Sequence, residues 1–232
     1  MYSLLNQFKI PFFFLCILFS FYIEANESQD SLKIGFGSCL DQDKSQNIWQ
    51  PLEKENLDSF FFMGDNVYGD SDSGELSKME AAYVKQEQRL PDWLKNLNPI
   101  AIWDDHDYGL DDGGGDYLLK VDSQKLFLDF WKVKEEDPRW HQEGIYFSEI
   151  RNINDNKILM LGLDTRYFRS PLTGEKRNYL AATNTNTTIL GKDQWRWLES
   201  KFQEKSDLII LVSSIQILAT NHGFEKWSNF PH

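Results

Sequence analysis

Short apolar runs that end in polar, chemically reactive residues are the feature that most constrains the fold of this chain. Six runs of this kind alternate with longer stretches that have helical periodicity. The expected strands are Leu32–Phe36, Ser59–Met63, Ile100–Trp103, Ile145–Ile150, Lys157–Leu163 and Leu208–Val212. Continuous apolar runs of this length, separated by helices, predict a layered α/β fold with strands buried on both faces.

The stretches between the strands carry helix and loop signals. The expected helices are the segment after Asn47, Glu75–Arg89, Ser123–Trp131 and Asp193–Gln203. Pro91 ends the second of these, because proline cannot continue a helix. Two segments rich in Gly, Asn, Thr and Asp, Gly109–Asp116 and Ser170–Thr188, predict surface loops that shape a specificity pocket.

The polar residues that follow the strands are expected to meet, because the carboxyl ends of strands in an open α/β sheet line one edge, where ligand crevices form. One crevice is expected to hold Cys39, Asp65, Tyr68, Asp105, His106 and Asp164. Such a concentration of carboxylates, with Asp104 and Asp107 nearby, requires a cation. Carboxylates suit hard cations, whereas a thiolate and a phenolate are donors that a Lewis-acidic metal such as Fe(III) holds. A dinuclear centre with two different metals is therefore predicted.

Taken one at a time, these residues also have structural explanations. Asp65 lies between Gly64 and Asn66 and can shape a turn, while Tyr68 and Cys39 can pack in a core. His106 is harder to explain in this way, since burial beside several carboxylates needs a reason.

The net charge of the chain argues against nucleic acid as a general partner. The 232 residues carry a formal net charge of -12, which disfavours a generic nucleic-acid binder because the overall field repels polyanions. A phosphodiester substrate remains compatible with this charge if metal ions bind it.

The N-terminus predicts export. Lys9 is followed by an uncharged apolar run, Ile10–Ile23, that is too short for a stable membrane span, and Ala25 offers a small residue for cleavage. Residues 1–25 are therefore interpreted as a signal peptide, with an uncleaved anchor as the alternative, and the protein as secreted, periplasmic or extracellular. The mature chain, 26–232, keeps Cys39 alone of the two cysteines and cannot form an internal disulfide.

Seven motifs occur in an order and spacing that resemble one family. They are Gly37-Ser38-Cys39, Gly64-Asp65-Asn66-Val67-Tyr68, Trp103-Asp104-Asp105-His106-Asp107-Tyr108, Leu163-Asp164-Thr165-Arg166, Gln194-Trp195-Arg196-Trp197-Leu198, Ser213-Ser214-Ile215-Gln216 and Gly223-Phe224-Glu225-Lys226-Trp227. From about Ile34 to its last residue the chain resembles the alkaline phosphatase D (PhoD-like) metallophosphatases. The Gly-Asp-x-x-Tyr element is also similar to that of purple acid phosphatases, in which the Asp bridges two metals and the Tyr binds ferric iron.

The resemblance implies a calcineurin-like α/β/β/α metallophosphatase fold and a secreted phosphoesterase that uses a metal-activated hydroxide on phosphate mono- or diesters. The implied centre pairs iron with calcium. Asp65 is then the bridging carboxylate, with Cys39 and Tyr68 on the iron and Asp105 and Asp104 on the second metal. His106 would face the substrate and protonate the leaving oxygen or stabilise the phosphoryl group. Arg166 is a candidate phosphate clamp, with a salt bridge as the alternative, and Gln216 has a weaker ligand or supporting role.

One departure from the family pattern concerns the C-terminal side. Relatives continue past the element that corresponds to Asn229–His232 and supply a Gly-Asp-x-His segment that completes the metal centre, whereas this chain contains no such segment. The expectation is an N-terminal portion of the metallophosphatase domain, and the alternative function is a non-catalytic fragment that binds metal or phosphate.

Overall fold

Two three-stranded sheets packed face to face form the centre of the chain in a computed structural model, which describes residues 31–153 and 155–231. Residues 1–25, interpreted above as a signal peptide, lie outside the described residues. The first sheet holds β1 (Ile34–Gly37), β2 (Ser59–Met63) and β3 (Ile100–Ile102), all parallel, in the order β1-β2-β3. The second holds β4 (Phe147–Ile153), β5 (Asn156–Gly162) and β8 (Leu208–Val212), in the order β4-β5-β8.

The second sheet is mixed. β4 and β5 run antiparallel with Phe147 opposite Gly162, whereas β5 and β8 run parallel with Ile158 opposite Leu208. The six predicted strands are therefore confirmed with small shifts at their ends. Burial on both faces holds for the central strands β2 and β5. It does not hold for the outer strands, since Phe36 of β1 is 43% exposed and Leu208 of β8 is 51% exposed.

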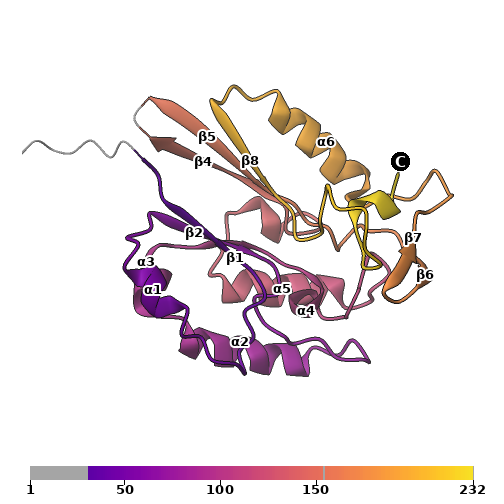
Figure 1. Cartoon of the computed structure of the whole chain (residues 1–232), viewed down its shortest axis with the longest axis horizontal. Helices are drawn as coiled ribbons and strands as arrows, with labels where there is room; N and C mark the ends of the chain where they lie inside the picture. The colour runs from indigo at the N-terminus through magenta and orange to yellow at the C-terminus, as the bar shows by residue number, and fades with distance from the viewer. Residues whose placement is uncertain (1–30, 154, 232) are drawn as a thin grey trace, which may run out of the picture.

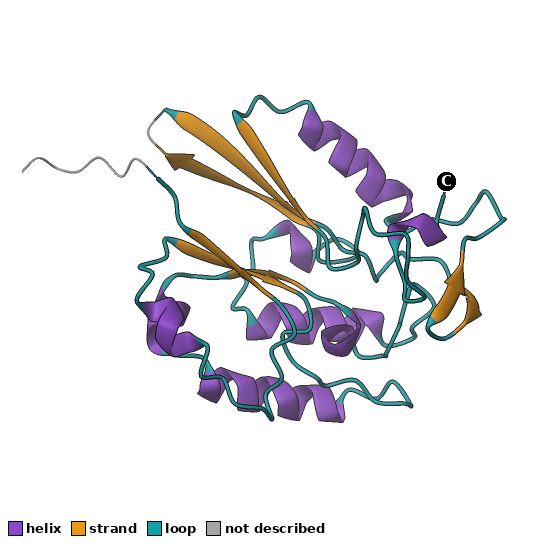
Figure 2. Cartoon of the chain, in the orientation of Figure 1, coloured by secondary structure: helices purple, strands orange, loops and turns teal. Residues whose placement is uncertain are grey.

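Helices cover the outer face of each sheet, as Figures 1 and 2 show. On the side of the first sheet lie α1 (Trp49–Glu53), α2 (Ser77–Arg89), α3 (Asp92–Asn96), α4 (Asp105–Tyr108) and α5 (Lys120–Phe130). On the side of the second sheet lies α6 (Gly191–Phe202). The order of layers is thus α/β/β/α, as the resemblance to the metallophosphatases implies. Two 3-10 turns, η1 (Pro138–Trp140) and η2 (Trp227–Asn229), complete the helical segments.

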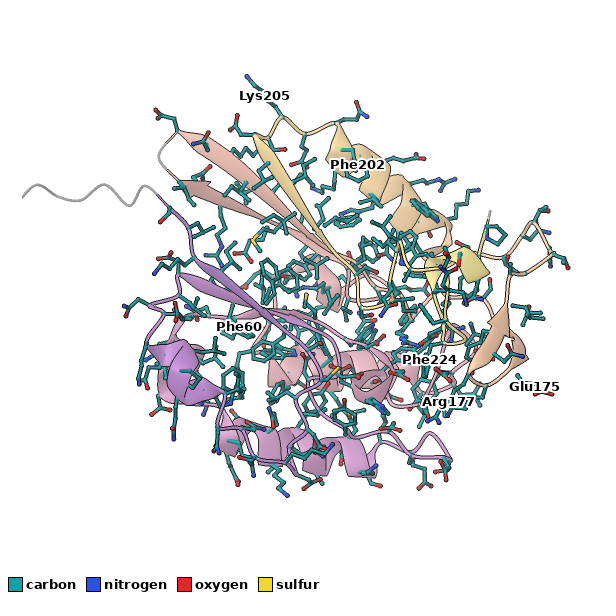
Figure 3. The ribbon with its side chains drawn as sticks, in the orientation of Figure 1. Phe60, Glu175, Arg177, Phe202, Lys205 and Phe224 are labelled. Atoms are coloured by element: carbon teal, nitrogen blue, oxygen red, sulfur yellow. The ribbon has the colours of Figure 1, made fainter. Side chains whose placement is uncertain are left out.

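Alternation of side chains along the central strands explains the layers. In β2, Phe60 and Phe62 pack on Trp49 under the helices, while Phe61 stacks on Phe147 of the other sheet at 5.9 Å between ring centroids. Figure 3 labels Phe60 in the first sheet. In β5, Met160 joins the core between the sheets, and its neighbours Leu159 and Leu161 join the core under α6. Period-two alternation of apolar residues on both faces is what a strand between two layers requires.

Gly162 sets the distance between the sheets. A Cβ at this position would lie 2.5 Å from Phe147 Cε1 and 2.9 Å from Ile102 Cγ2. Any larger residue would therefore push β5 away from its neighbours, because cores at native density leave no space for an added methyl group.

The segment Ser170–Thr188, predicted as a loop, is an exception to the sequence analysis. It contains a short antiparallel hairpin of β6 (Thr173–Glu175) and β7 (Asn178–Leu180). The prediction is wrong there because exposed Thr, Gly and Asn residues give no alternating apolar signal. The other predicted loop, Gly109–Asp116, contains no helix or strand.

None of the helices in the described part of the chain is long and apolar enough to cross a membrane.

Candidate metal centre

The candidate site lies where β1, β2 and β3 end. The loops after β1 and β2 stay paired, since the Cys39 N–H donates to Gly64 O at 3.1 Å and the Leu40 N–H donates to Asp65 O at 2.8 Å. Cys39 and Asp65 both have positive φ, 59° and 53°. Non-glycine residues in this region carry strain that the surrounding structure must hold, and such residues gather at functional sites.

Gly64 brings the end of β2 against the end of β3. Its φ is +106°, and a Cβ there would lie 2.7 Å from Asp104 Cβ and 2.8 Å from Asp104 N. Only glycine combines this backbone conformation with so close an approach. The carboxylates that follow the two strands therefore come together.

Asp65 is the centre of the first donor group. Its Oδ2 accepts from the Tyr68 hydroxyl at 3.4 Å and lies 3.7 Å from Cys39 Sγ. Residues from two separate loops thus place a thiol, a phenol and a carboxylate around one point. This is the trio that the resemblance assigns to iron.

A second group shares Asp65. One ligand atom each from Asp65, Asp105 and His106 lies within 4.8 Å of the others. The His106 ring packs against the Tyr68 ring at 4.4 Å between centroids, and its Nδ1 lies 2.7 Å from Asp70 Oδ1. Asp65 therefore stands between the two groups, as a bridging carboxylate would.

The pKa shifts show how crowded the negative charges are. Burial, with the neighbouring Asp104 and Asp105 carboxylates, raises the pKa of Asp65 to about 7. Burial and Asp65 also raise the pKa of Tyr68, and burial raises that of Cys39. For His106, burial lowers the pKa, but the hydrogen bond with Asp70 and the charges of the nearby carboxylates outweigh it and raise the pKa to about 9. In the absence of cations, protons on these groups relieve the repulsion.

These residues fit a bound metal centre. Asp65 Oδ1 is buried and has no hydrogen-bond partner among the described residues, and a buried carboxylate oxygen needs a partner. The donor set combines carboxylates with a thiol, a phenol and an imidazole, the ligands that transition metals and hard divalent cations prefer in proteins. A cation would replace the protons on Asp65, Cys39 and Tyr68.

Arg166 lies behind the site and is 1% exposed. Its Nε and Nη2 donate to Asp104 Oδ1 at 2.7 and 2.5 Å, and Nη2 also lies 3.7 Å from Asp105 Oδ1. The structure thus shows the salt bridge that was one of the two interpretations of Arg166. Its contact with a substrate phosphate stays a prediction.

The surroundings of Asp105 and Asp104 shift their pKa values in opposite directions. Burial raises the pKa of Asp105, but the charges of Arg166 and His106, together with backbone hydrogen bonds, outweigh burial and hold the pKa below its usual value. For Asp104, burial is the larger influence, and its pKa is raised despite Arg166. The net effect of these surroundings favours the charged form of Asp105 and disfavours that of Asp104.

Asp164 does not join the site, contrary to the expectation of one crevice. Its carboxylate is fully buried and accepts hydrogen bonds from Trp103 Nε1 and from the N–H groups of Ile145, Arg166 and Tyr167, each at 2.9 Å. These four hydrogen bonds tie the turn after β5 to the residue that follows β3 and to the segment before β4, so Asp164 has a structural role.

Asp107 also has a structural role that the sequence analysis missed. It is fully buried and accepts the backbone N–H groups of Asp65, Asn66 and Asp104 at 3.1, 3.1 and 2.6 Å. The spacing of Asp104 and Asp107 at the start of α4 is that of an N-terminal capping pair, the signal that could have predicted this contact.

Both predicted loops approach the site and contact each other. Asp112 of Gly109–Asp116 accepts from the Tyr179 hydroxyl of β7 at 2.7 Å, and Lys176, between β6 and β7, pairs with Asp111. A cavity of about 430 Å³ opens beside Asp104 and Asp105. The cavity is further lined by Asp112, Ser214, Ile215, Gln216, His222, Phe224 and Glu225. A larger cavity of about 780 Å³ shares none of these residues and lies at the opposite end of β3, next to Ile100.

The fold of this chain is similar to that of solved structures. No protein-family model and no curated protein matches the sequence. Six chains of solved structures match, among them one described as the structure of PhoD, with a TM-score of 0.61 and 18% sequence identity. The alignment covers 86% of this chain and 46% of that one, so this chain spans about half the length of the PhoD chain. Over the aligned residues, the protein has the fold of PhoD.

Proposed function

We propose that this protein is a metal-dependent phosphoesterase that hydrolyses phosphate mono- or diesters. The observation that carries the proposal is the position of Asp65 between a thiol–phenol pair, Cys39 and Tyr68, and a carboxylate–imidazole pair, Asp105 and His106. The PhoD fold supports it, as do the motifs that resemble the alkaline phosphatase D family.

The candidate ligands would bind two cations, which the family resemblance implies are iron and calcium. Cys39 and Tyr68 would hold the first, Asp105 and Asp104 the second, and Asp65 both. When bound, such a pair supplies Lewis acidity, lowers the pKa of a coordinated water and neutralises charge on a phosphoryl group.

His106 would act on the substrate directly. Its Nδ1 is engaged by Asp70 at 2.7 Å, which fixes the ring and leaves Nε2 to face an ester oxygen. A donor held in this way can give a proton to a leaving alkoxide or stabilise a phosphoryl oxygen. Asp70 would therefore be a positioning residue for His106.

The place of action is part of the proposal. Residues 1–25 have the pattern of a signal peptide, which would direct the protein to the periplasm or outside the cell.

The alternative function is binding of metal or phosphate without turnover, since the group formed by Asp65, Asp105 and His106 could hold a cation whether or not hydrolysis follows. The two functions differ in a single measurement, which is hydrolysis by metal-loaded protein.

The test uses the reading frame without residues 1–25. Bound metals are measured by mass spectrometry, and turnover is measured with p-nitrophenyl phosphate and bis(p-nitrophenyl) phosphate. We expect Asp65→Ala and Tyr68→Phe to lose metal and at least a hundredfold in turnover, whereas Tyr146→Phe, which removes the hydroxyl of a ring that packs on Trp197, keeps both. Unchanged metal content and turnover in Asp65→Ala and Tyr68→Phe would overturn the proposed function. Metal binding without turnover in the unsubstituted protein would establish the second one.

A further inference from the structure

Two buried arginines lie behind the acidic side of the candidate centre and share one carboxylate. Arg166 and Arg169 are 1% and 2% exposed. Arg166 Nη2 pairs with Glu225 Oε1, and Arg169 Nε lies 3.6 Å from Glu225 Oε2. The Glu225 side chain is itself only 9% exposed. Ionised side chains are buried to this extent only when they are paired.

Through Arg166, Glu225 reaches the candidate ligands of the second cation. Arg166 donates to Asp104 Oδ1 from both Nε and Nη2, and its Nη2 lies 3.7 Å from Asp105 Oδ1. The planar guanidinium therefore fixes both carboxylates from behind, because its N–H groups form a rigid fork.

Through Arg169, Glu225 reaches Asp105 by a second path. Arg169 Nη2 donates to Asp112 O at 2.5 Å, and the Asp112 N–H donates to Asp105 Oδ2 at 2.8 Å. The contacts form a closed ring, from Glu225 to Arg166, Asp105, Asp112, Arg169 and back to Glu225.

The negative charge of Glu225 balances the positive charges of the two arginines in this ring. Without the Glu225 charge, Arg166 would be paired with Asp104 and Asp105 alone, and Arg169 would lose its ion pair with Glu225. Arg166 would then hold the two carboxylates more strongly and compete with any cation for them, since removing one partner of a buried pair leaves an uncompensated charge. A third cation in this region, Lys226, donates instead to the carbonyl oxygens of His222 and Phe224.

We propose that Glu225 is a positioning residue for the second cation of the centre, acting through Arg166 on Asp104 and Asp105. Glu225 lies in the segment after β8, two residues after Gly223. A Cβ at Gly223 would clash with the carbonyl oxygen of Arg177. The Tyr179 N–H also donates to Gly223 O at 2.9 Å, and Figure 3 labels Phe224 and Arg177 on these two segments. These contacts hold the segment against the hairpin of β6 and β7 and so fix the position of Glu225. The inference rests on the proposed function, because it assigns a partner to that function's metal ligands.

The test separates the two sides of the centre. The protein without residues 1–25 is loaded with Fe(III), the visible phenolate-to-iron absorption of Tyr68 is recorded, and Ca²⁺ is then titrated by calorimetry. Glu225→Gln is compared with Glu149→Gln, which also removes a carboxylate from an arginine pair, that with Arg151 on β4. We expect Glu225→Gln to keep the iron absorption and bind Ca²⁺ at least tenfold more weakly, while Glu149→Gln matches the unsubstituted protein on both counts.

A second measurement needs no metal. Hydrogen exchange of the backbone amides in 104–115 should quicken about tenfold in metal-free Glu225→Gln and stay unchanged in Glu149→Gln. Ca²⁺ affinity within twofold of the unsubstituted protein, or equal loss of the iron absorption and of Ca²⁺ binding, overturns the positioning role. If the unsubstituted protein binds neither Fe(III) nor Ca²⁺, the proposed function fails and this inference fails with it.

Discussion

The buried carboxylate of Asp107 accepts the backbone N–H of Asp65 at 3.1 Å. The same carboxylate accepts the N–H of Asp104 at 2.6 Å, so it ties together the loops that follow β2 and β3. The candidate ligands Asp65, Asp104 and Asp105 lie close together because of Asp107, whose own carboxylate is not one of the candidate ligands. Geometry and stability of the site are therefore coupled at Asp107.

Replacing Asp107 is expected to destabilise the whole chain. Asp107→Ala removes the acceptor of one buried N–H group, that of Asn66, and of two half-buried ones, those of Asp65 and Asp104, which should lower the free energy of unfolding by about 3 kcal/mol. Urea denaturation followed by circular dichroism measures this loss. Asp129→Ala, at an exposed position of α5, should change the free energy of unfolding by less than about 0.5 kcal/mol. A similar small change in Asp107→Ala would contradict the role of the carboxylate.

The strands and the meeting of their carboxyl ends were predictable from the sequence because both follow from short-range patterns. Phe60–Met63 is apolar throughout and had to lie between two layers, and the residues at positions 39, 65 and 105 follow apolar runs within one or two residues. The antiparallel direction of β4 was not predictable, since an apolar run has the same period whichever way the strand runs.

Long-range ion pairs were not predictable from the sequence, for a different reason. Nothing local to Arg166 or Glu225 shows that they are partners, because their contact depends on how the segment after β8 folds over the site. Asp107 is an intermediate case. Its capping pattern was visible, yet its acidity was attributed to a metal, since a cluster of carboxylates does not show which of them are buried and fully hydrogen-bonded.

Packing between the sheets gives a prediction at Gly162. The added methyl group of Gly162→Ala would meet the Phe147 ring at 2.5 Å, and overpacking of this kind costs about 1–3 kcal/mol. Phe147→Leu removes the aromatic atoms that the new methyl group meets. The double variant should therefore be more stable than the sum of the two single losses predicts, by about 0.5 kcal/mol or more, as measured by a double-mutant cycle. Strict additivity would contradict the contact.

Asp137 gives a prediction for the dependence of stability on pH. Burial raises its pKa, but hydrogen bonds from the side chain and backbone of Arg139 outweigh burial and lower it below the usual value. A carboxyl with a lowered pKa in the folded state stabilises that state above its unfolded pKa, about 3.9, and the contribution is lost as the pH falls through the folded value. Unfolding measured at pH 2–7 should show that Asp137→Asn is less stable than the unsubstituted protein at pH 6 and that the difference shrinks below pH 4. A difference that is constant over this range would show that Arg139 does not respond to the Asp137 charge.

Cys39 reports metal binding without any assay of turnover. It is the one cysteine among the described residues, it is exposed, and its Sγ lies 3.7 Å from the carboxylate that would bridge the two cations. A thiolate bound to a metal is a weaker nucleophile toward an alkylating reagent, since the metal withdraws electron density from the sulfur. Alkylation by iodoacetamide, followed by mass spectrometry of the peptide that contains Cys39, should therefore slow at least tenfold after Fe(III) is added. Ca²⁺ alone should give little protection, because a hard cation does not take a thiolate ligand. The control is Asp65→Ala, in which Cys39 keeps its exposure but the shared carboxylate is gone, so that Fe(III) should protect it much less. Equal protection in Asp65→Ala and in the unsubstituted protein would mean that Cys39 binds iron without Asp65 and that the two donors do not belong to one centre.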